Sequence, residues 1–254
     1  MLDSMKHKIL VIIPAYNEEK NIVRVVTQLT KTVPEVSYII INDCSCDNTA
    51  RICRKYGYNY MSLPINLGIG GVVQAGYQYA LDHDYDIAVQ MDGDGQHDAK
   101  YIHRIIQPII DEEADIVIGS RFLTGEGFQS SGMRRAGINF LSFLIRLCSG
   151  TRVKDVTSGF RAVNRKFIRI YAGEYSQDYP EPEAIIAGAM NQGRIKEVPV
   201  IMHERKAGIS SINLWGSVYY MIKVSLAIFF YAIGGHKKYS AADAHDAHRL
   251  LTKG

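Results

Sequence analysis

Cysteine, net charge and long apolar runs are all scarce in this sequence. Its 254 residues include four cysteines, and one residue separates Cys44 from Cys46, where a zinc knuckle or a redox pair would have two. No second pair follows, so a disulfide framework is excluded as the main architecture. We expect the thiols to be reduced and to serve as small packing residues.

The charge balance gives no reason to expect nucleic acid as a partner. The chain has 29 lysines and arginines against 26 acidic residues, and no Lys/Arg-rich block of five or more residues occurs. The apolar run at 9–13 is too short for the core of a signal peptide, so secretion by that route is not expected. With 47% hydrophobic residues, the chain is apolar and long enough to bury a core as one domain.

Short apolar runs alternate with helix-length amphipathic segments through the first half. Runs typical of buried strands occupy residues 9–13, 38–41, 86–90 and 116–118, and helical spacing of apolar residues occurs at 21–29, 72–81 and 102–110. This alternation predicts an open parallel α/β sheet. Ligands of such sheets lie beyond the carboxyl ends of the strands, so functional residues are expected directly after each run.

The second half is less regular. Residues 124–135 are rich in Gly, Ser and Arg and predict a loop, 136–148 and 214–233 predict apolar helices, and 197–202 predicts a strand. Pro108 is expected to bend or end the helix at 102–110. Because the sequence has no internal repeat and no low-complexity linker, we expect a single domain.

Acidic and amide side chains follow three of the predicted strands. The segments are 14–19 (PAYNEE), 42–49 (NDCSCDNT) and 91–98 (MDGDGQHD). In the third, a single glycine separates Asp92 from Asp94, and Mg²⁺ or Mn²⁺ typically takes one or two such carboxylates together with substrate phosphates. Asp-Gly-Asp-Gly is also an ordinary turn; its position after a buried strand, beside two other acidic strand ends, favours the metal site.

A glycine-rich segment at 66–71 precedes the predicted helix at 72–81. Backbone N–H groups at a helix start attract anions, so Gly68 and its neighbours are candidates to bind a phosphate. The segment is not a dinucleotide fingerprint, because Val73 stands where the third glycine is needed. A plain flexible turn is the alternative.

In this order, the motifs resemble those of family 2 glycosyltransferases with the GT-A fold, and most closely those of the dolichol- or polyprenol-phosphate sugar synthases. The matching segments are 13–18 (IPAYNE), 41–45 (INDCS) with 47–49 (DNT), 66–70 (NLGIG), 90–97 (QMDGDGQH), 118–122 (IGSRF), 155–161 (DVTSGFR) and 197–200 (EVPV), then 204–205 and 208–210. The resemblance implies an α/β GT-A fold over residues 8–211. Such a fold has a Rossmann-like, nucleotide-binding mixed sheet flanked by helices, here in a single domain with a C-terminal amphipathic helix.

The resemblance also implies roles for individual residues. Those that resemble nucleotide-sugar-binding positions are Pro14, Tyr16, Glu18, Asp43, Gly68, Asp92 and Arg205. Those that resemble ligands of Mg²⁺ or Mn²⁺ are Asp92, Asp94 and Gln96, the last as a ligand or a sugar contact. Arg121, Arg161 and Arg205 resemble basic positions that bind the diphosphate or an acceptor phosphate. Of these residues, Asp94, Arg121 and Arg161 are expected to take part in catalysis.

One departure from the family pattern bears on the acceptor. The chain lacks the Glu-Asp base motif and the Gln-x-x-Arg-Trp motif of many members that act on sugar hydroxyls. Where the base is expected, the sequence reads Tyr179-Pro180-Glu181-Pro182-Glu183, and the prolines stiffen the backbone around two carboxylates. Glu183 or Glu181 is therefore a candidate base, although Glu183 is equally suited to a helix N-terminus.

The expected reaction is inverting transfer of a sugar from a nucleoside diphosphate sugar to a polyprenyl-phosphate or lipid-linked glycan acceptor, in the synthesis of a cell-envelope glycan. The alternative acceptor is a sugar hydroxyl of a growing polysaccharide, with Glu183 as base. A nucleotidyltransferase and a non-catalytic sugar-nucleotide-binding module are the rivals. The glycine-rich start of the former is missing, whereas the latter would not need Asp92, Asp94 and Arg121.

The C-terminal part predicts contact with a membrane surface. Residues 212–235 predict an apolar helix and 236–254 a polar tail. Only 224–233 is apolar almost throughout, with Ser225 as its polar exception, and it is too short to cross a bilayer that needs about 20 residues. Because basic residues at 236–238 suit anionic headgroups, we expect a cytoplasmic protein held peripherally at the inner face of the membrane. A buried core helix is the alternative, and a homo-oligomer is left open.

Overall fold

A mixed seven-stranded sheet organises the chain. The computed structural model describes residues 7–127, 132–177, 180–203 and 223–229. The strands, in the spatial order β3-β2-β1-β4-β6-β5-β7, are β3 (Tyr60–Ser62), β2 (Ser37–Asn42), β1 (Ile9–Ala15), β4 (Ile87–Gln90), β6 (Arg161–Asn164), β5 (Ile116–Ser120) and β7 (Ile195–Pro199). The helices are α1 (Ile22–Thr32), α2 (Thr49–Tyr56), α3 (Gly68–Asp82), the short 3₁₀ helix η2 (Ala99–Tyr101), α4 (Ile102–Ile110), α5 (Gly132–Ser149), α6 (Arg165–Gly173) and α7 (Pro180–Met190).

The mixed character comes from β6. This strand pairs antiparallel with both β4 and β5, whereas the pairs among β1, β2, β3 and β4, and the pair of β5 with β7, are parallel. The α/β class, the mixed sheet and the parallel first half are confirmed. β6 itself did not stand out in the sequence, because its four residues begin with an arginine and end with an asparagine.

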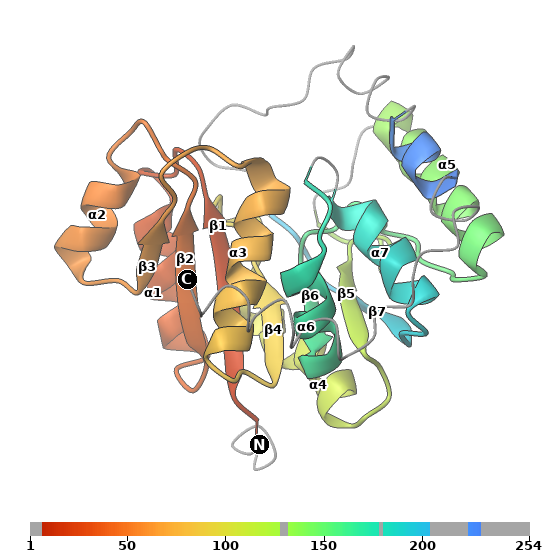
Figure 1. Ribbon diagram of the computed structural model, residues 1–254, viewed down its shortest axis with the longest axis horizontal. Coiled ribbons are helices and arrows are strands. Elements are labelled where there is room, and N and C mark those ends of the chain that lie inside the picture. The colour runs from red at the N-terminus through yellow and green to blue at the C-terminus, as the bar shows by residue number, and fades with distance from the viewer. Residues whose placement is uncertain (1–6, 128–131, 178–179, 204–222, 230–254) are drawn as a thin grey trace, which may run out of the picture.

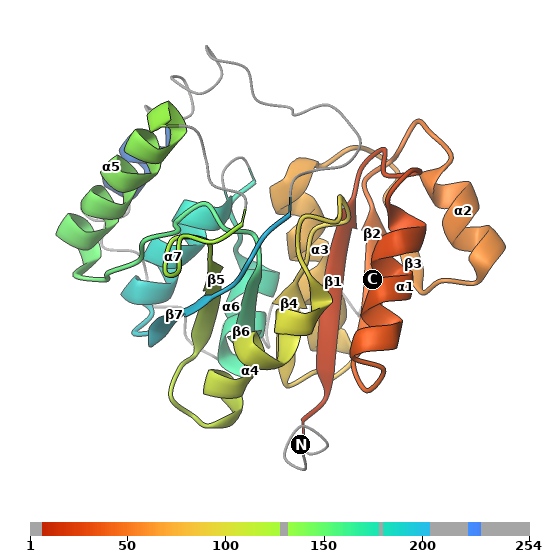
Figure 2. The ribbon, with the colours of Figure 1, turned by 180° about the vertical axis from the view of Figure 1, so that it is seen from behind.

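Helices cover both faces of the sheet and create two apolar cores. In Figure 1, α3 and α6 lie over the near face, and Figure 2 shows α1 and α4 over the opposite face. Along β1, Leu10 and Ile12 belong to the first core, and Val11 and Ile13 to the second. Every residue of β1 is buried, which explains why its sequence is continuously apolar instead of alternating.

The boundaries differ from the sequence expectations at three places. Strand β7 ends at Pro199, two residues after the start of the predicted strand at 197–202. Pro108 lies in the last turn of α4, where the loss of one helical hydrogen bond is cheap, so the helix continues to Ile110. Helix α5 begins at Gly132, within the predicted loop at 124–135.

The described part of the predicted C-terminal helix packs against α5. Residues 223–229 are helical, and Val224 and Ile228 are buried in the same core as Ile138 and Leu141 of α5. The rest of the predicted apolar helix at 212–235 and the predicted polar tail at 236–254 lie outside the described residues. Among the described helices, none is long and apolar enough to cross a membrane.

Candidate active site

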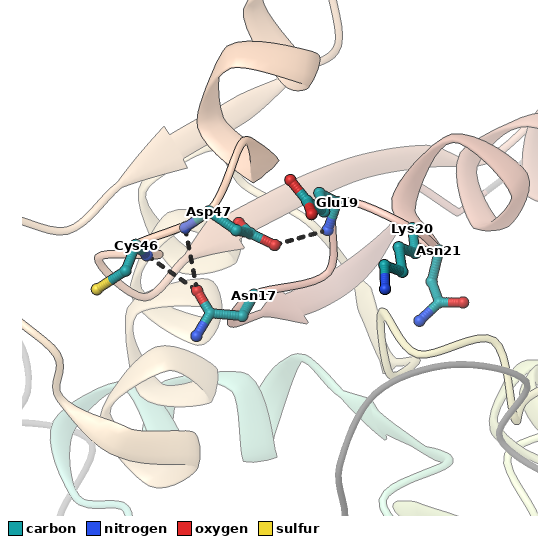
Figure 3. Close-up of a pocket in the computed structure, with 6 residues that line it drawn as sticks. All are labelled: Asn17, Glu19, Lys20, Asn21, Cys46 and Asp47. Carbon is teal, nitrogen blue, oxygen red and sulfur yellow. Dashed lines mark hydrogen bonds between the residues drawn. The ribbon is translucent and has the colours of Figure 1, made fainter.

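The loops that follow β1 and β2 are joined by side-chain hydrogen bonds at the carboxyl edge of the sheet. Asn17, in the left-handed backbone region at φ 56°, accepts with Oδ1 from the backbone N–H of Cys46 at 2.9 Å, and Asp47 Oδ2 accepts from the N–H of Glu19 at 3.0 Å (Figure 3). These residues line a pocket of about 380 Å³, which Lys20 and Asn21 complete. The two loops are thus held together by hydrogen bonds and form a pocket at this edge of the sheet.

The three site residues predicted at the end of β1 are Pro14, Tyr16 and Glu18, and they differ in exposure and in hydrogen bonding. Tyr16 is half exposed, whereas Glu18 is buried and accepts a hydrogen bond from Asn21 Nδ2 at 2.7 Å. The carbonyl of Pro14 accepts from the N–H of Gly93 at 3.2 Å. A side chain at Gly93 would place its Cβ 2.8 Å from that carbonyl, so only glycine lets the turn carrying Asp92 approach β1 so closely.

Asp43 and Gly68 meet directly. The buried carboxylate of Asp43 accepts from the N–H of Leu67 at 2.7 Å and from the N–H of Gly68 at 3.0 Å. It therefore satisfies backbone donors at the start of α3, next to the end of β2. Gly68 has φ +74°, the left-handed region that glycine adopts without strain. The sequence predicted both residues for one site but not this contact.

Asp92 and Asp94 lie in the turn directly after β4. The side chain of Asp92 is 32% exposed, and Asp94 Oδ1 accepts from the N–H of Gln96 at 2.9 Å. Arg24 supports the turn by donating from Nη2 to the carbonyl of Asp94 at 3.4 Å. Two carboxylates in a tight, glycine-containing turn fit Mg²⁺ or Mn²⁺, which takes one or two protein carboxylates and completes its shell with phosphate oxygens and water. Among the described residues, no group of three or more His, Cys, Asp or Glu side chains is arranged to hold a metal ion.

Gln96 is tied to the segment after β7. Its Nε2 donates to the carbonyl of His203 at 3.3 Å, and its own carbonyl accepts from the N–H of His203 at 2.9 Å. These bonds attach the turn of Asp94 to the last described residues before 204. Arg205, predicted to bind the donor or acceptor phosphate, lies outside the described residues.

His97 is a site residue that the sequence reasoning missed. Its buried ring stacks on Phe160, with centroids 4.8 Å apart, and Nδ1 accepts from the N–H of Asp92 at 3.0 Å. Burial lowers the pKa of His97 to about 4, although Asp94 acts to raise it. The imidazole is therefore neutral at pH 7, which suits its role as an acceptor. The sequence feature that could have identified His97 as a site residue is its position three residues after Asp94.

Gly159 and Gln90 are two further residues that were missed. A Cβ on Gly159 would lie 3.0 Å from Nε2 of Gln90 and 3.2 Å from both carboxylate oxygens of Asp92. Gln90 is fully buried, and neither its Nε2 nor its Oε1 has a hydrogen-bond partner among the described residues. An unsatisfied buried amide costs about 1–3 kcal/mol, so its position beside the metal turn calls for a functional reason.

Arg121 already has a strong partner. Its Nε donates to Asp155 Oδ2 at 2.8 Å and its Nη2 to Asp155 Oδ1 at 2.6 Å, and both side chains are buried. Nη2 also donates to the hydroxyl of Thr157 at 3.0 Å. The sequence predicted a phosphate-binding role for Arg121 and did not anticipate this bidentate ion pair.

Arg161 and Glu181 lie together under the site. Arg161 is fully buried at the start of β6 and donates from Nη1 to the carbonyl of Glu181 at 3.1 Å and from Nη2 to that of Ser158 at 2.6 Å. Burial opposes its charge, but Tyr175 and Glu181 favour it and keep the pKa of Arg161 above the usual value. Burial also raises the pKa of Glu181; Arg161 opposes that shift and Asp92 adds to it.

The two candidate bases are carried by the same helix turn. Glu181 and Glu183 both lie in the first turn of α7. The side chain of Glu181 interacts with Arg161 and Asp92. Glu183 is half-buried and follows two residues later, about 200° further round the helix.

The fold defined here is GT-A-like. Glucosyl-3-phosphoglycerate synthase from Mycobacterium tuberculosis, solved with Mn²⁺, UDP-glucose and phosphoglyceric acid, matches with a TM-score of 0.69 over 91% of this chain and 82% of that chain. The sequences are 18% identical, so this likeness concerns the fold alone. The profile of Glycosyl transferase family 2 matches residues 10–171. The chain belongs to this family and is a glycosyltransferase.

Among its relatives are enzymes named for lipid phosphate acceptors. UDP-N-acetylglucosamine–dolichyl-phosphate N-acetylglucosaminyltransferase from Methanococcus voltae is 34% identical, over 76% of this chain and 84% of its own length. Polyprenol monophosphomannose synthase from Mycolicibacterium smegmatis is 28% identical, over 80% of this chain and 80% of its own length. The family resemblance read from the motifs is thereby confirmed.

Proposed function

We propose that this glycosyltransferase moves a sugar, with inversion, from a nucleoside diphosphate sugar to a polyprenyl phosphate or a polyprenyl-linked acceptor used in cell-envelope glycan synthesis. The observation that carries the donor half is the turn after β4, in which Asp92 and Asp94 follow a buried strand at the carboxyl edge of the sheet. The acceptor half is supported by the relatives named for dolichyl phosphate and polyprenol phosphate.

Asp92 and Asp94, with Gln96 as a further ligand or sugar contact, would hold Mg²⁺ or Mn²⁺. The bound ion would neutralise the charge that builds up on the leaving diphosphate. His97 fixes the backbone of Asp92. The half-exposed Tyr16 and the neighbouring Pro14, Glu18, Asp43 and Gly68 form the nucleotide side of the proposed site.

The arginines supply positive charge next to this turn. The charge of Arg121 acts to lower the pKa of His97, the residue that accepts from the N–H of Asp92. Arg161 interacts with Glu181, which in turn interacts with Asp92. Preorganised cations of this kind stabilise a developing anion without reorganising during the reaction. We assign Arg205 to the same anion-binding set.

The attacking group decides whether a protein base is needed. The oxygen of a polyprenyl phosphate is already anionic and needs none. A sugar hydroxyl would need one, and Glu183 is the base that the sequence suggested first. Glu181 is the second candidate for that alternative reaction, because burial and the charge of Asp92 both raise its pKa.

Product analysis tests the proposal. The protein is incubated with Mn²⁺, a panel of nucleoside diphosphate sugars, and either a polyprenyl phosphate or an oligosaccharide. Release of a nucleoside diphosphate with a glycosylated polyprenyl phosphate supports it. Transfer to the oligosaccharide alone favours the hydroxyl acceptor, release of pyrophosphate indicates a nucleotidyltransferase, and donor binding without turnover indicates a binding module.

The membrane part of the proposal is that the enzyme lies peripherally on the cytoplasmic face of a membrane, where a lipid acceptor is available. The basic residues at 236–238 and the apolar stretch at 212–235 support it through their composition alone.

A further inference from the structure

Helix α5 carries apolar side chains on two opposite sides. Ile138, Leu141 and Ile145 are buried in the core. Phe140 and Phe143 are 51% and 61% exposed, and Leu147 is 70% exposed. Each exposed residue lies two positions from a buried one, which corresponds to about 200° around a helix. A surface helix normally needs only the core-facing stripe, so packing on the core does not account for the second stripe.

The helix at 223–229 repeats this arrangement beside α5. Val224 and Ile228 are buried, whereas Leu226 and Phe229 are each 51% exposed. The two helices lie side by side in both Figure 1 and Figure 2, and their buried residues share one core. Five of the eleven large hydrophobic residues exposed in the described chain therefore gather on two adjacent helices. We call this group the outer stripe: Phe140, Phe143, Leu147, Leu226 and Phe229.

The sequence segments that contain the outer stripe carry charge of one sign. Residues 127–154 contain five basic and no acidic residues, and residues 205–242 contain five basic and no acidic residues, so all 26 acidic residues lie elsewhere. Arg134, Arg146 and Arg152 are exposed. None of these three takes part in an ion pair between described residues. A second copy of this face would be repelled by the like charge, whereas an anionic surface would be attracted.

The start of α5 packs against the loop that follows β5. The guanidinium of Arg135 packs 3.3 Å from the ring centroid of Phe122, and Phe122 directly follows Arg121. Strand β5, which ends at Ser120, runs parallel to β7 and antiparallel to β6, so its carboxyl end lies at the same edge as that of β4. A surface that docks on the outer stripe would therefore come close to the turn of Asp92.

We infer that the outer stripe is a membrane-docking surface that inserts its aromatic and aliphatic side chains into the headgroup region of an anionic bilayer. The inference deepens the proposed function, and it rests on that function only for the identity of the acceptor. It assigns docking to α5 as well as to the C-terminal helix. Apolar insertion supplies the depth of binding and the exposed arginines supply the preference for anionic lipid.

Vesicle sedimentation of the full chain tests the inference. Phosphatidylcholine vesicles are compared with vesicles that also contain phosphatidylglycerol. We expect binding to the mixed vesicles, weakening with added salt because screening reduces the attraction of surface charges. The double variant Phe143→Glu/Leu147→Glu should lose on the order of tenfold or more in affinity for the mixed vesicles. Both side chains are exposed, so unchanged melting of the variant is expected.

Two matched controls separate the inference from the proposed function. Tyr56→Glu changes an aromatic residue that is 53% exposed on α2, which lies at the far end of the molecule from α5 in Figure 1 and Figure 2, and should bind vesicles normally. Asp92→Asn, in the proposed metal turn, should also bind vesicles normally. If product analysis finds no sugar transfer to a polyprenyl phosphate but the vesicle results hold, the proposed function fails and docking stands.

Three results would overturn the inference. The wild type would fail to sediment with the mixed vesicles if other residues of the chain cover the outer stripe. The double variant would sediment as well as the wild type if docking used another surface. A wild-type dimer that the double variant converts to monomers, without vesicle binding, would make the stripe an interface between copies of this chain.

Discussion

The buried carboxylate of Asp155 accepts two parallel hydrogen bonds from the buried guanidinium of Arg121. The bonds measure 2.8 and 2.6 Å, and a third joins the N–H of Arg121 to Asp155 Oδ2 at 3.0 Å. The pair ties the loop after β5 to the loop that precedes β6. Glu197 of β7 extends the connection by accepting from the N–H of Asp155 at 2.9 Å. These bonds link the loop after β5, the loop before β6 and strand β7.

We predict that Asp155→Asn lowers the free energy of unfolding by about 3–5 kcal/mol, because it leaves the buried charge of Arg121 without its counter-charge. Urea denaturation measures the change. Asp84→Asn is the control, since Asp84 pairs with Arg165 but is 77% exposed, and exposed pairs contribute about 0–1 kcal/mol. Equal effects of the two substitutions would show that the Arg121 pair is not critical to the fold.

Asp92→Asn and Asp94→Asn should each reduce sugar transfer by about a hundredfold or more, because each removes a charge that holds the proposed metal ion. The fold should survive, since the side chain of Asp92 is 32% exposed at a strand end. Nucleoside diphosphate release at saturating Mn²⁺ measures the activity, and the melting temperature serves as control. Near-normal turnover of both variants would remove the metal site from this turn.

His97→Phe should keep the stacking on Phe160 but lose the acceptor for the N–H of Asp92. An unsatisfied buried donor costs about 1–3 kcal/mol, and we expect this loss to appear as a higher Mn²⁺ concentration for half-maximal activity. His97→Asn is the matched variant, because its side-chain oxygen can take the place of Nδ1. If Asn fails as badly as Phe, the hydrogen bond is not what positions Asp92.

Glu181→Gln and Glu183→Gln distinguish the two acceptor chemistries. If a sugar hydroxyl attacks and Glu181 is the base, Glu181→Gln should lose about 10²–10⁴-fold in turnover. In the wild type, activity should then rise with pH through the raised pKa of Glu181, because only the ionised carboxylate accepts a proton. Donor affinity should not change.

A different outcome supports the phosphate acceptor. If both variants keep more than about a tenth of wild-type turnover, neither carboxylate is the base. The same loss seen for Glu183→Gln alone would instead assign the base to Glu183.

The local pattern of the sequence determined much of this fold. The continuous apolar run at 9–13 predicted a strand buried on both faces, and helical spacing predicted α1, α3 and α4. The turn of Asp92 and Asp94 could be located because it directly follows such a run. These features depend on residues close together in the chain, so their periods and turn residues are visible in the sequence.

Only the tertiary structure decided which of these residues act together. The antiparallel strand β6, the contact of Asp43 with Gly68, the pairing of Arg121 with Asp155 and the support of Asp92 by His97 were not predicted. The same holds for the outer stripe, because apolar spacing alone does not say which side of α5 meets the core. Each of these depends on partners brought together by packing, and sequence periodicity carries no information about a partner on another element.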